Sequence, residues 1–95
     1  MSQPDLIIHD EKDNVGVVVI ETTKKGQDCS AWIMENDKTV KVQSTNDVPL
    51  GHKIALRDLK IGDTIFKYGH DIGKVVQEIK KGEHVHVHNV KTKKW

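Results

Sequence analysis

Four glycines of this 95-residue chain occur in the same local setting, and that setting limits what the chain can fold into. Each follows an apolar or basic residue and precedes a polar one, just before a β-rich run. The four segments are Lys25-Gly26-Gln27, Leu50-Gly51-His52, Ile61-Gly62-Asp63 and Lys81-Gly82-Glu83. Because glycine adopts positive φ at little steric cost, such segments are typical of tight turns. The pattern therefore predicts many short strands joined by glycine turns.

The runs between these turns are rich in β-branched residues. Val15–Ile20 is nearly continuous in apolar residues, as expected of a strand that is covered on both faces. Gly16 within it suggests a bulge or a close backbone approach. Cys29–Glu35 and Lys38–Gln43 flank Asn36-Asp37, and together they predict a β-hairpin whose second strand has one wet and one dry face.

Further extended segments are expected along the rest of the chain. They are Leu6–Ile8, Ile54–Leu56, Thr64–Lys67 and Ile72–Ile79. We expect at most one helical turn, at Arg57-Asp58-Leu59, since no segment carries a long apolar stripe at helical spacing. Aromatic residues make up only 4% of the chain, so Val, Ile and Leu must build the core, which favours strands. The sequence predicts one all-β domain over residues 1–95, with residues 1–5 and 91–95 as flexible or partner-bound termini.

The charge balance excludes two classes of partner. Lys and Arg number 15 against 14 Asp and Glu, a formal net charge of +1, so no large field directs the chain toward nucleic acid or an anionic membrane. The basic tail Lys91–Trp95 lacks interleaved aromatic residues apart from its last one, which favours a solvated or partner-bound terminus. No apolar run approaches the roughly 18 residues that a membrane span needs.

The single cysteine and the amino-terminal sequence predict a cytoplasmic protein. Cys29 has no second cysteine for an internal disulfide or a multi-cysteine metal site, which fits a reducing compartment. We expect it to be a small buried residue, because no basic partner that would activate a nucleophile is evident. Met1–Asp5 lacks a basic region followed by a long apolar core, so no signal peptide is expected.

The most distinctive polar feature is the run His84-Val85-His86-Val87-His88, which holds three of the six histidines. In an extended strand the imidazoles fall on one face and the valines on the other. Alternate side chains of a strand stand about 7 Å apart and roughly parallel, which disfavours three ligands to one metal ion. Direct metal binding by one of these histidines, substrate binding or proton transfer at a subunit boundary, and a solvated or interface-packed face stay open as alternatives.

Two further segments carry residue types that suit an anionic ligand. The Gly51 turn presents His52 and Lys53, which can receive a carboxylate with the help of backbone N–H groups. Lys67 and Tyr68 place a cation beside a phenolic hydroxyl, just before another glycine. An ordinary turn with solvated side chains explains each segment when it is taken alone.

Trp32-Ile33-Met34 makes the first strand of the predicted hairpin more apolar than a free surface requires. Packing within the hairpin is the simpler interpretation. A protein–protein contact is the alternative, since an exposed Trp beside a Met is typical of interface cores.

Taken as an ordered set, five segments resemble the small N-terminal domain, or separate small subunit, of the altronate dehydratase and galactarate dehydratase family. The segments are Asp13–Val17, Val48–Leu56, Lys67–Gly69, Ile72-Gly73 and Gly82–Asn89. The resemblance extends over roughly residues 6 to 92. It implies a SAF-like (β-clip) fold, which agrees with the all-β prediction made from short strands and glycine turns.

The resemblance also implies a function. The chain would be the small subunit of a hydroxy-acid lyase, inactive alone, that lines or covers the active site of a large catalytic subunit. The implied reaction is a β-elimination, in which a proton leaves the carbon next to the carboxylate and hydroxide or sulfite leaves the neighbouring carbon. Iron (Fe²⁺) is the implied cofactor, expected mainly in the large subunit.

The resemblance assigns roles to residues of this chain. His52 and His86 are the catalytic candidates, because a histidine can carry a proton at neutral pH. Cationic donors suit a substrate that bears a carboxylate and a second anionic group. The substrate-binding candidates are Lys53, Lys67, Tyr68, His84 and His88. No residue of the chain is assigned as a metal ligand.

Two stretches, Ser30–Asp37 and Lys91–Trp95, favour the branch of the family that releases sulfite from 3-sulfolactate and forms pyruvate. One alternative is the small subunit of an altronate- or galactarate-type sugar-acid dehydratase. A second alternative, from a different class, is a non-catalytic SAF-like module that binds a carboxylated ligand or another protein. A large partner subunit is expected under either lyase interpretation.

Overall fold

The computed structural model of the chain describes residues 3–67, 70–86 and 88–91. These residues form eleven short strands and no helix, which confirms the all-β prediction. The strands are β1 (Leu6–Ile8), β2 (Val15–Val18), β3 (Thr22–Thr23), β4 (Asp28–Ile33), β5 (Lys38–Gln43), β6 (Val48–Pro49), β7 (Lys53–Ala55), β8 (Thr64–Lys67), β9 (His70–Val75), β10 (His84–Val85) and β11 (Val90–Lys91). Within the described residues no helix is present that is long and apolar enough to cross a membrane.

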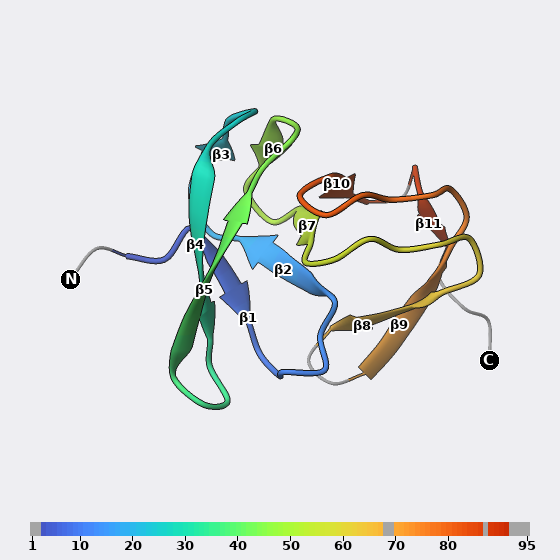
Figure 1. The fold of residues 1–95 in the computed structure, drawn as a ribbon, viewed down its shortest axis with the longest axis horizontal. Coiled ribbons are helices and arrows are strands. Elements are labelled where there is room, and N and C mark those ends of the chain that lie inside the picture. Colours follow the sequence, from blue (N-terminus) through green and yellow to red (C-terminus); the bar gives the residue numbers. More distant parts are fainter. Residues whose placement is uncertain (1–2, 68–69, 87, 92–95) are drawn as a thin grey trace.

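Three sheets share these strands (Figure 1). The largest has six strands in the order β10-β7-β2-β1-β4-β5, and a three-stranded sheet has the order β11-β9-β8. A third sheet pairs β3 with β6. The predicted hairpin is confirmed, because β4 pairs antiparallel with β5 from Asp28 opposite Gln43 to Ile33 opposite Lys38. Asp37 in the connecting turn has a φ of 56°, a left-handed conformation that Asp tolerates better than most residues.

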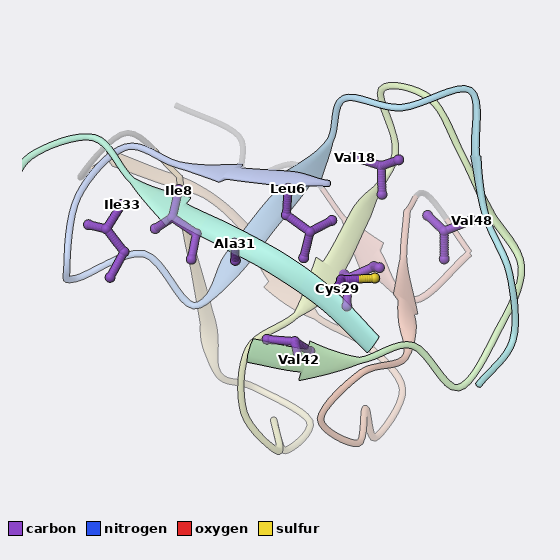
Figure 2. Close-up of a cluster of buried hydrophobic side chains, with 9 residues drawn as sticks. Leu6, Ile8, Val18, Cys29, Ala31, Ile33, Val42 and Val48 are labelled. Atoms are coloured by element: carbon purple, nitrogen blue, oxygen red, sulfur yellow. The ribbon is translucent and has the colours of Figure 1, made fainter. Parts of the chain in front are cut away.

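The core consists of two clusters of aliphatic side chains on opposite sides of the central strand pair β2–β7. Val18 and Ile54 belong to the first cluster, and Val15 and Ala55 belong to the second. Strand side chains alternate between faces, so one pair of strands can serve both clusters. The first cluster comprises Leu6, Ile8, Val18, Cys29, Ala31, Ile33, Val42, Val48 and Ile54 (Figure 2). The second comprises Val15, Ala55, Leu59, Ile65, Val75, Ile79 and Val85.

Two of the glycine turns are built alike and interlock. In each turn the glycine N–H donates a hydrogen bond of 2.9 Å to the last residue of a strand in the other half. Gly62 donates to the carbonyl of Val75 in β9, and Gly82 donates to the carbonyl of Ala55 in β7. At the centre, Leu59 and Ile79 exchange backbone hydrogen bonds of 2.7 and 2.9 Å. The segment from β7 to β8 and the segment from β9 to β10 therefore form two equivalent halves around the Leu59–Ile79 bridge.

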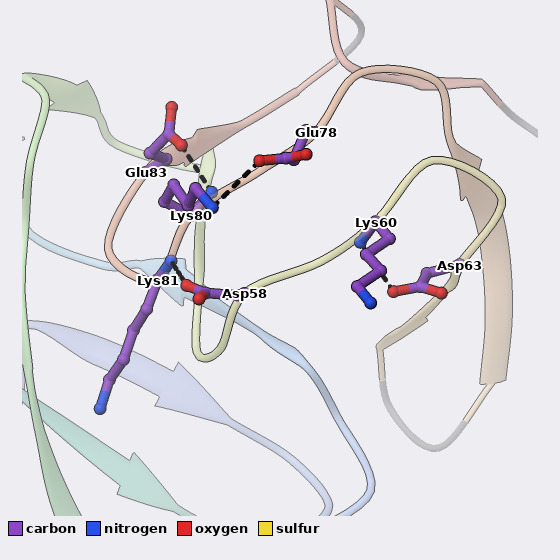
Figure 3. Close-up of polar contacts among 7 residues, drawn as sticks. All are labelled: Asp58, Lys60, Asp63, Glu78, Lys80, Lys81 and Glu83. Carbon is purple, nitrogen blue, oxygen red and sulfur yellow. Dashed lines mark hydrogen bonds and ion pairs between the residues drawn. The ribbon is translucent and has the colours of Figure 1, made fainter.

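Side chains close both turns in the same way (Figure 3). Asp63 accepts the N–H of Lys60 at 2.8 Å, and Glu83 accepts the N–H of Lys80. Asp58 accepts the N–H of Lys81 at 2.8 Å and so ties the first half to the second turn. Each carboxylate satisfies a turn N–H that would otherwise depend on water.

All four glycines of the recurring pattern have positive φ, as the sequence predicted. The angles are 85° at Gly26, 86° at Gly51, 96° at Gly62 and 88° at Gly82. Gly16 is different, because the register of β2 with β7 is continuous there and no bulge forms. A Cβ at Gly16 would lie 3.4 Å from Ile8 and 3.5 Å from Leu6, which are ordinary van der Waals distances to side chains, so the alternative of a close backbone approach is wrong as well.

Two other local predictions were wrong. Arg57–Leu59 forms no helical turn, because Leu59 is drawn into the bridge with Ile79. The segment Ile72–Ile79 is not one continuous strand: β9 ends at Val75, and Ile79 returns only as the other half of that bridge. In both cases a long-range backbone pairing overrides the local preference.

The Gly82 turn provides a test of how tightly the two halves interlock. A Cβ at Gly82 would lie 2.1 Å from the carbonyl oxygen of Gln43, whereas a Cβ at Gly26 meets nothing within 4 Å. Gly82→Ala should lower the free energy of unfolding by more than about 3 kcal/mol. Gly26→Ala should lower the free energy of unfolding by about 1–2 kcal/mol, because only the strain of a positive φ at alanine opposes it. Urea denaturation of both variants measures the difference, and equal losses would contradict the packing described for Gly82.

Candidate functional site

Four of the chain's histidines gather at one end of the six-stranded sheet. Nδ1 of His52 lies 2.7 Å from Nε2 of His84, within hydrogen-bonding distance. The ring of His86 stacks on His52 with centroids 3.8 Å apart and planes inclined by 15°. The ring of His88 lies 5.0 Å from that of His84. We call His52, His84, His86 and His88 the histidine cluster.

Strand register explains why residues so far apart in sequence meet. β10 pairs antiparallel with β7, so that His84 lies opposite Ile54 and Val85 lies opposite Lys53. One further step in this register places His86 opposite His52. The side chains of two residues that lie directly opposite in an antiparallel pair are neighbours on the same face of the sheet. A ring side chain can also reach the residue two positions further along the partner strand, its diagonal neighbour. His52 therefore has His86 across from it and His84 on the diagonal.

The prediction of one extended strand through His84, His86 and His88 was wrong. β10 ends at Val85, and the chain turns between His86 and Asn89. The buried side chain of Asn89 holds this turn: its amide N–H donates to the carbonyl of His84 at 2.8 Å, and its Oδ1 accepts the N–H of His86 at 3.0 Å. An amide can do both because it is donor and acceptor at once. Val87 lies outside the described residues.

The environment of the cluster disfavours positive charge on two of its rings. Burial, followed by the neighbouring histidines and Lys53, lowers the pKa of His84 from 6.5 to about 4. Burial and then the charges of His52, Lys53 and His88 also lower the pKa of His86. Both imidazoles are consequently neutral at pH 7 and available as hydrogen-bond acceptors. Burial, with a contribution from Lys67, lowers the pKa of the Lys53 ammonium as well.

The structure brings most of the sequence-predicted site residues together. His52, His84, His86 and His88 form the cluster, and Lys53 is close enough to affect His84 and His86. Lys67 acts in turn on Lys53. Tyr68, the remaining candidate, lies outside the described residues. The catalytic and binding roles of these residues stay predictions.

Sequence reasoning missed the polar residues that hold and surround the cluster. An open pocket of about 420 Å³ borders it, lined by Lys25, Asn46, Asp47, Glu83, His84 and His88. Oδ1 of Asn46 accepts the N–H of His84 at 3.0 Å and so joins a distant loop to the site. Asn89 was visible in the sequence as the residue that ends the histidine run, which is a signal for a turn. The sequence carries no comparable signal for Asn46.

The described residues do not by themselves fit an iron centre. No group of three or more His, Cys, Asp or Glu side chains among them is arranged to hold a metal ion. The rings of His52, His84 and His86 are stacked, and the facing nitrogens of His52 and His84 are engaged with each other. Stacked imidazoles do not direct their nitrogens at one point, as metal ligation requires.

Packing in the core and the hairpin accounts for most of the other residues that the sequence singled out. Ile33 is packed in the first core, and Nε1 of Trp32 donates to Asp37 at 2.8 Å, so hairpin packing accounts for both. Met34 is 44% exposed and remains the candidate contact residue of that segment. Cys29 is fully buried, as expected, and burial raises the pKa of its thiol, which disfavours a nucleophilic role.

Comparison with known proteins identifies the family. Residues 4–93 match the family described as the altronate/galactarate dehydratase SAF domain. The chain belongs to this family. Its β-only architecture is that of a SAF domain, and the resemblance inferred from the sequence is confirmed.

The relatives of this SAF domain differ in length. It is 52% identical over 91 residues to the (2R)-sulfolactate sulfo-lyase subunit alpha of Chromohalobacter salexigens, covering 96% of this chain and 97% of that protein. It is 46% identical over 63 residues to the protein of the same name from Paracoccus pantotrophus, with 66% and 94% covered. The altronate dehydratase of Bacillus subtilis is 40% identical over 82 residues, which span 86% of this chain and 15% of that enzyme.

The lowered pKa of His84 makes the stability of the domain depend on pH. Between about pH 6.5 and about pH 4 the unfolded chain binds a proton at His84 that the folded chain does not bind, so the free energy of unfolding falls as the pH falls. His86 acts in the same direction. Urea unfolding at pH 7.5 and pH 4.5 measures the loss. His84→Gln should reduce it, whereas the matched variant at an exposed histidine, His70→Gln, should not. An unchanged pH dependence in His84→Gln would contradict the assignment.

Asn89 should contribute to stability through its two side-chain hydrogen bonds. Asn89→Ala leaves the carbonyl of His84 and the N–H of His86 without their partners, at a cost of about 1–3 kcal/mol in the free energy of unfolding. Gln77→Ala, at an exposed position, serves as the control. A loss at Asn89 no larger than that at Gln77 would show that the turn is held by other contacts.

Proposed function

We propose that this SAF domain is the alpha subunit of a (2R)-sulfolactate sulfo-lyase, a carbon–sulfur lyase that works together with a large catalytic subunit. The observation that carries the proposal is the 52% identity to a protein of that name over nearly the whole length of both chains. The altronate dehydratases match only through 15% of their length, so in them the SAF domain is one part of a longer chain. We infer that a short chain of this kind is inactive alone.

The chemistry of the proposed reaction defines what the site must supply. A base removes the proton from C2 of 3-sulfolactate, the electron pair forms the C2–C3 double bond, and sulfite leaves C3 with the electrons of the C–S bond. The resulting enol rearranges to pyruvate. The substrate carries a carboxylate and a sulfonate, so cationic groups must hold it, and the base must be unprotonated before the proton arrives.

The residues around the histidine cluster have the properties that this reaction requires. His86 is held neutral at pH 7 by its surroundings and stacks on His52, and we propose that these two residues carry protons. Lys53 and Lys67 are the proposed cationic donors for the two anionic groups. His84, His88 and Tyr68 are proposed to complete the substrate-binding face.

We place the iron centre implied by the family in the large subunit, since the described residues do not assemble an iron site. Iron would supply a Lewis acid for the hydroxyl or carboxylate oxygens of the substrate. The open pocket beside the histidine cluster is the proposed position at which the partner closes the site, with Met34 as a further contact. We propose a cytoplasmic location, where the buried free thiol of Cys29 stays reduced.

A sugar-acid dehydratase small subunit is the second candidate, because the 40% identity to an altronate dehydratase extends over 86% of this chain. The two candidates share proton removal next to a carboxylate and differ in the leaving group. Substrate assays therefore distinguish them.

The proposal is tested by purifying the tagged chain from its native cell and assaying sulfite release from (2R)-3-sulfolactate. We expect a large partner to co-purify and sulfite to be formed. His52→Ala should lower kcat by at least about 100-fold with the complex intact, because general base catalysis contributes about 10²–10⁴-fold. His70→Ala, at an exposed histidine, is the matched control and should leave kcat unchanged.

Other outcomes would redirect the assignment. A partner complex that dehydrates altronate or galactarate without releasing sulfite would favour the second candidate. Failure to recover any partner would leave a SAF-like binding module. Full activity of His52→Ala in an intact complex would remove His52 from the mechanism.

A further inference from the structure

One face of the six-stranded sheet changes from polar to apolar between its edge and its centre. The register places four residues side by side on this face, Thr39 of β5, Trp32 of β4, Ile7 of β1 and Val17 of β2. At β5 the face is polar and exposed, with Thr39 and Lys41. At β1 and β2 it carries Ile7 and Val17, although a sheet face in contact with water is normally polar. The apolar part of this face is therefore expected to be covered.

The valines at β2 show where the cover provided by the chain itself ends. Val15, Val17 and Val19 are two residues apart and share this face, and the N–H of Val19 continues the pairing with β1 by donating to Asp5 at 3.0 Å. Val15 is 1% exposed because it packs in the second core, Val17 is half-buried, and Val19 is 43% exposed. Figure 1 shows β8 and β9, which supply part of that core, on the side of β2 away from β4 and β5. The second core thus opens to solvent along β2.

The turn before β7 extends the apolar row toward the histidine cluster. Backbone hydrogen bonds donated by Leu50 and Gly51 join this turn to the segment that holds Val19. Leu50 is 57% exposed. His52 ends the same turn, so a molecule that covers Leu50 also lies beside the histidine cluster. We call four apolar residues of this face and turn the apolar patch: Ile7, Val17, Val19 and Leu50.

The length of the relatives indicates what covers the apolar patch. In the altronate dehydratase of Bacillus subtilis the matching region is 15% of a much longer chain, so the SAF domain has the rest of that enzyme as a covalent neighbour. The sulfo-lyase subunit alpha of Chromohalobacter salexigens is matched over 97% of its length, so it lacks such a neighbour within its own chain. In a short chain of this kind, the surface that meets the remainder of the enzyme must bind a separate subunit.

The charges around the apolar patch favour a protein as its occupant. Lys53 lies opposite Val17 in the register, whereas Asp5 and Glu21 lie on the segments next to Val19 and Leu50. Both signs of charge are therefore present at the border. An apolar centre with a polar border is typical of protein–protein interfaces, and an interface that continues a core resembles those of obligate complexes.

We propose that the apolar patch is the docking surface for the large catalytic subunit, which completes the cover of the second core and is thereby brought beside His52. The inference rests on the proposed function for the identity of the partner and adds the face that the partner binds. The large subunit contributes an apolar surface that excludes water from Val19 and Leu50.

The chain offers a matched control for a test of this docking surface. Ile61 precedes Gly62 as Leu50 precedes Gly51, both glycines have positive φ, and Ile61 is 69% exposed but lies outside the patch. The Kd of the full chain for the purified large subunit is measured by biolayer interferometry. Leu50→Glu and Val19→Glu should each raise the Kd by at least about 30-fold, because a carboxylate would be buried without a partner. Ile61→Glu should leave the Kd unchanged.

A footprint on the unmodified chain checks the same surface. In methyl ¹H–¹³C spectra of the labelled chain, the signals of Ile7, Val17, Val19 and Leu50 should shift when the purified large subunit is added, and that of Ile61 should not. If Leu50→Glu does not fold in urea denaturation, Val19→Glu and the spectra decide. Wild-type affinity of both glutamate variants, or a footprint confined to Ile61, would overturn the proposal.

The outcomes separate the docking surface from the proposed function. A complex that depends on Leu50 and Val19 but releases no sulfite from sulfolactate would support the docking surface and contradict the proposed activity. A complex that releases sulfite and is insensitive to both variants would do the reverse. A dimer of the isolated chain in sedimentation analysis, abolished by Leu50→Glu, would give the patch to a second copy and overturn the proposal.

Discussion

The pairing of β7 with β10 is the constraint on which the rest of the structure depends. It brings together segments that are distant in sequence, and the Gly82 turn secures it: Gly82 donates to the carbonyl of Ala55, and Ala55 donates to that of Glu83. The same turn accepts a hydrogen bond from Thr45, so the first half of the chain is fixed to it as well. Closing such long loops costs conformational entropy, so specific contacts are needed to close them. The packing of Gly82 against the backbone of Gln43 is one such contact, and only a residue without a Cβ fits there.

The histidine cluster is a consequence of that pairing. Val85 enters the second core while His84 takes the opposite face, since successive side chains of a strand alternate. The valine that anchors β10 therefore determines which way its histidine points. A shift of the register by one residue would bury His84 and expose Val85, and it would separate His84 from His52.

Charge gives the site its chemical character. The causes that lower the pKa values of His84 and His86 are burial and neighbouring cations, with no carboxylate among them. Such surroundings keep imidazoles uncharged beside lysines, a combination that suits an anionic substrate from which a proton must be removed. The proposed β-elimination would use this arrangement of neutral imidazoles and lysines.

The sequence by itself determined part of the local structure. The glycine turns could be predicted because glycine adopts positive φ at little steric cost, and the β4–β5 hairpin because its apolar and polar residues alternate over a short connection. The site residues could be named from the family resemblance, without their geometry.

Only the tertiary structure decided how those residues meet. The His52–His84 hydrogen bond and the stacking of His86 on His52 depend on the register between distant strands, which no local pattern encodes. The end of β10 at Val85 depends on the side chain of Asn89, whose two hydrogen bonds outweigh the strand preference of the alternating run. The meeting of the histidines follows from long-range backbone pairing, and the end of β10 follows from the hydrogen bonding of buried polar groups. The free energies of these interactions exceed those of local conformational preferences.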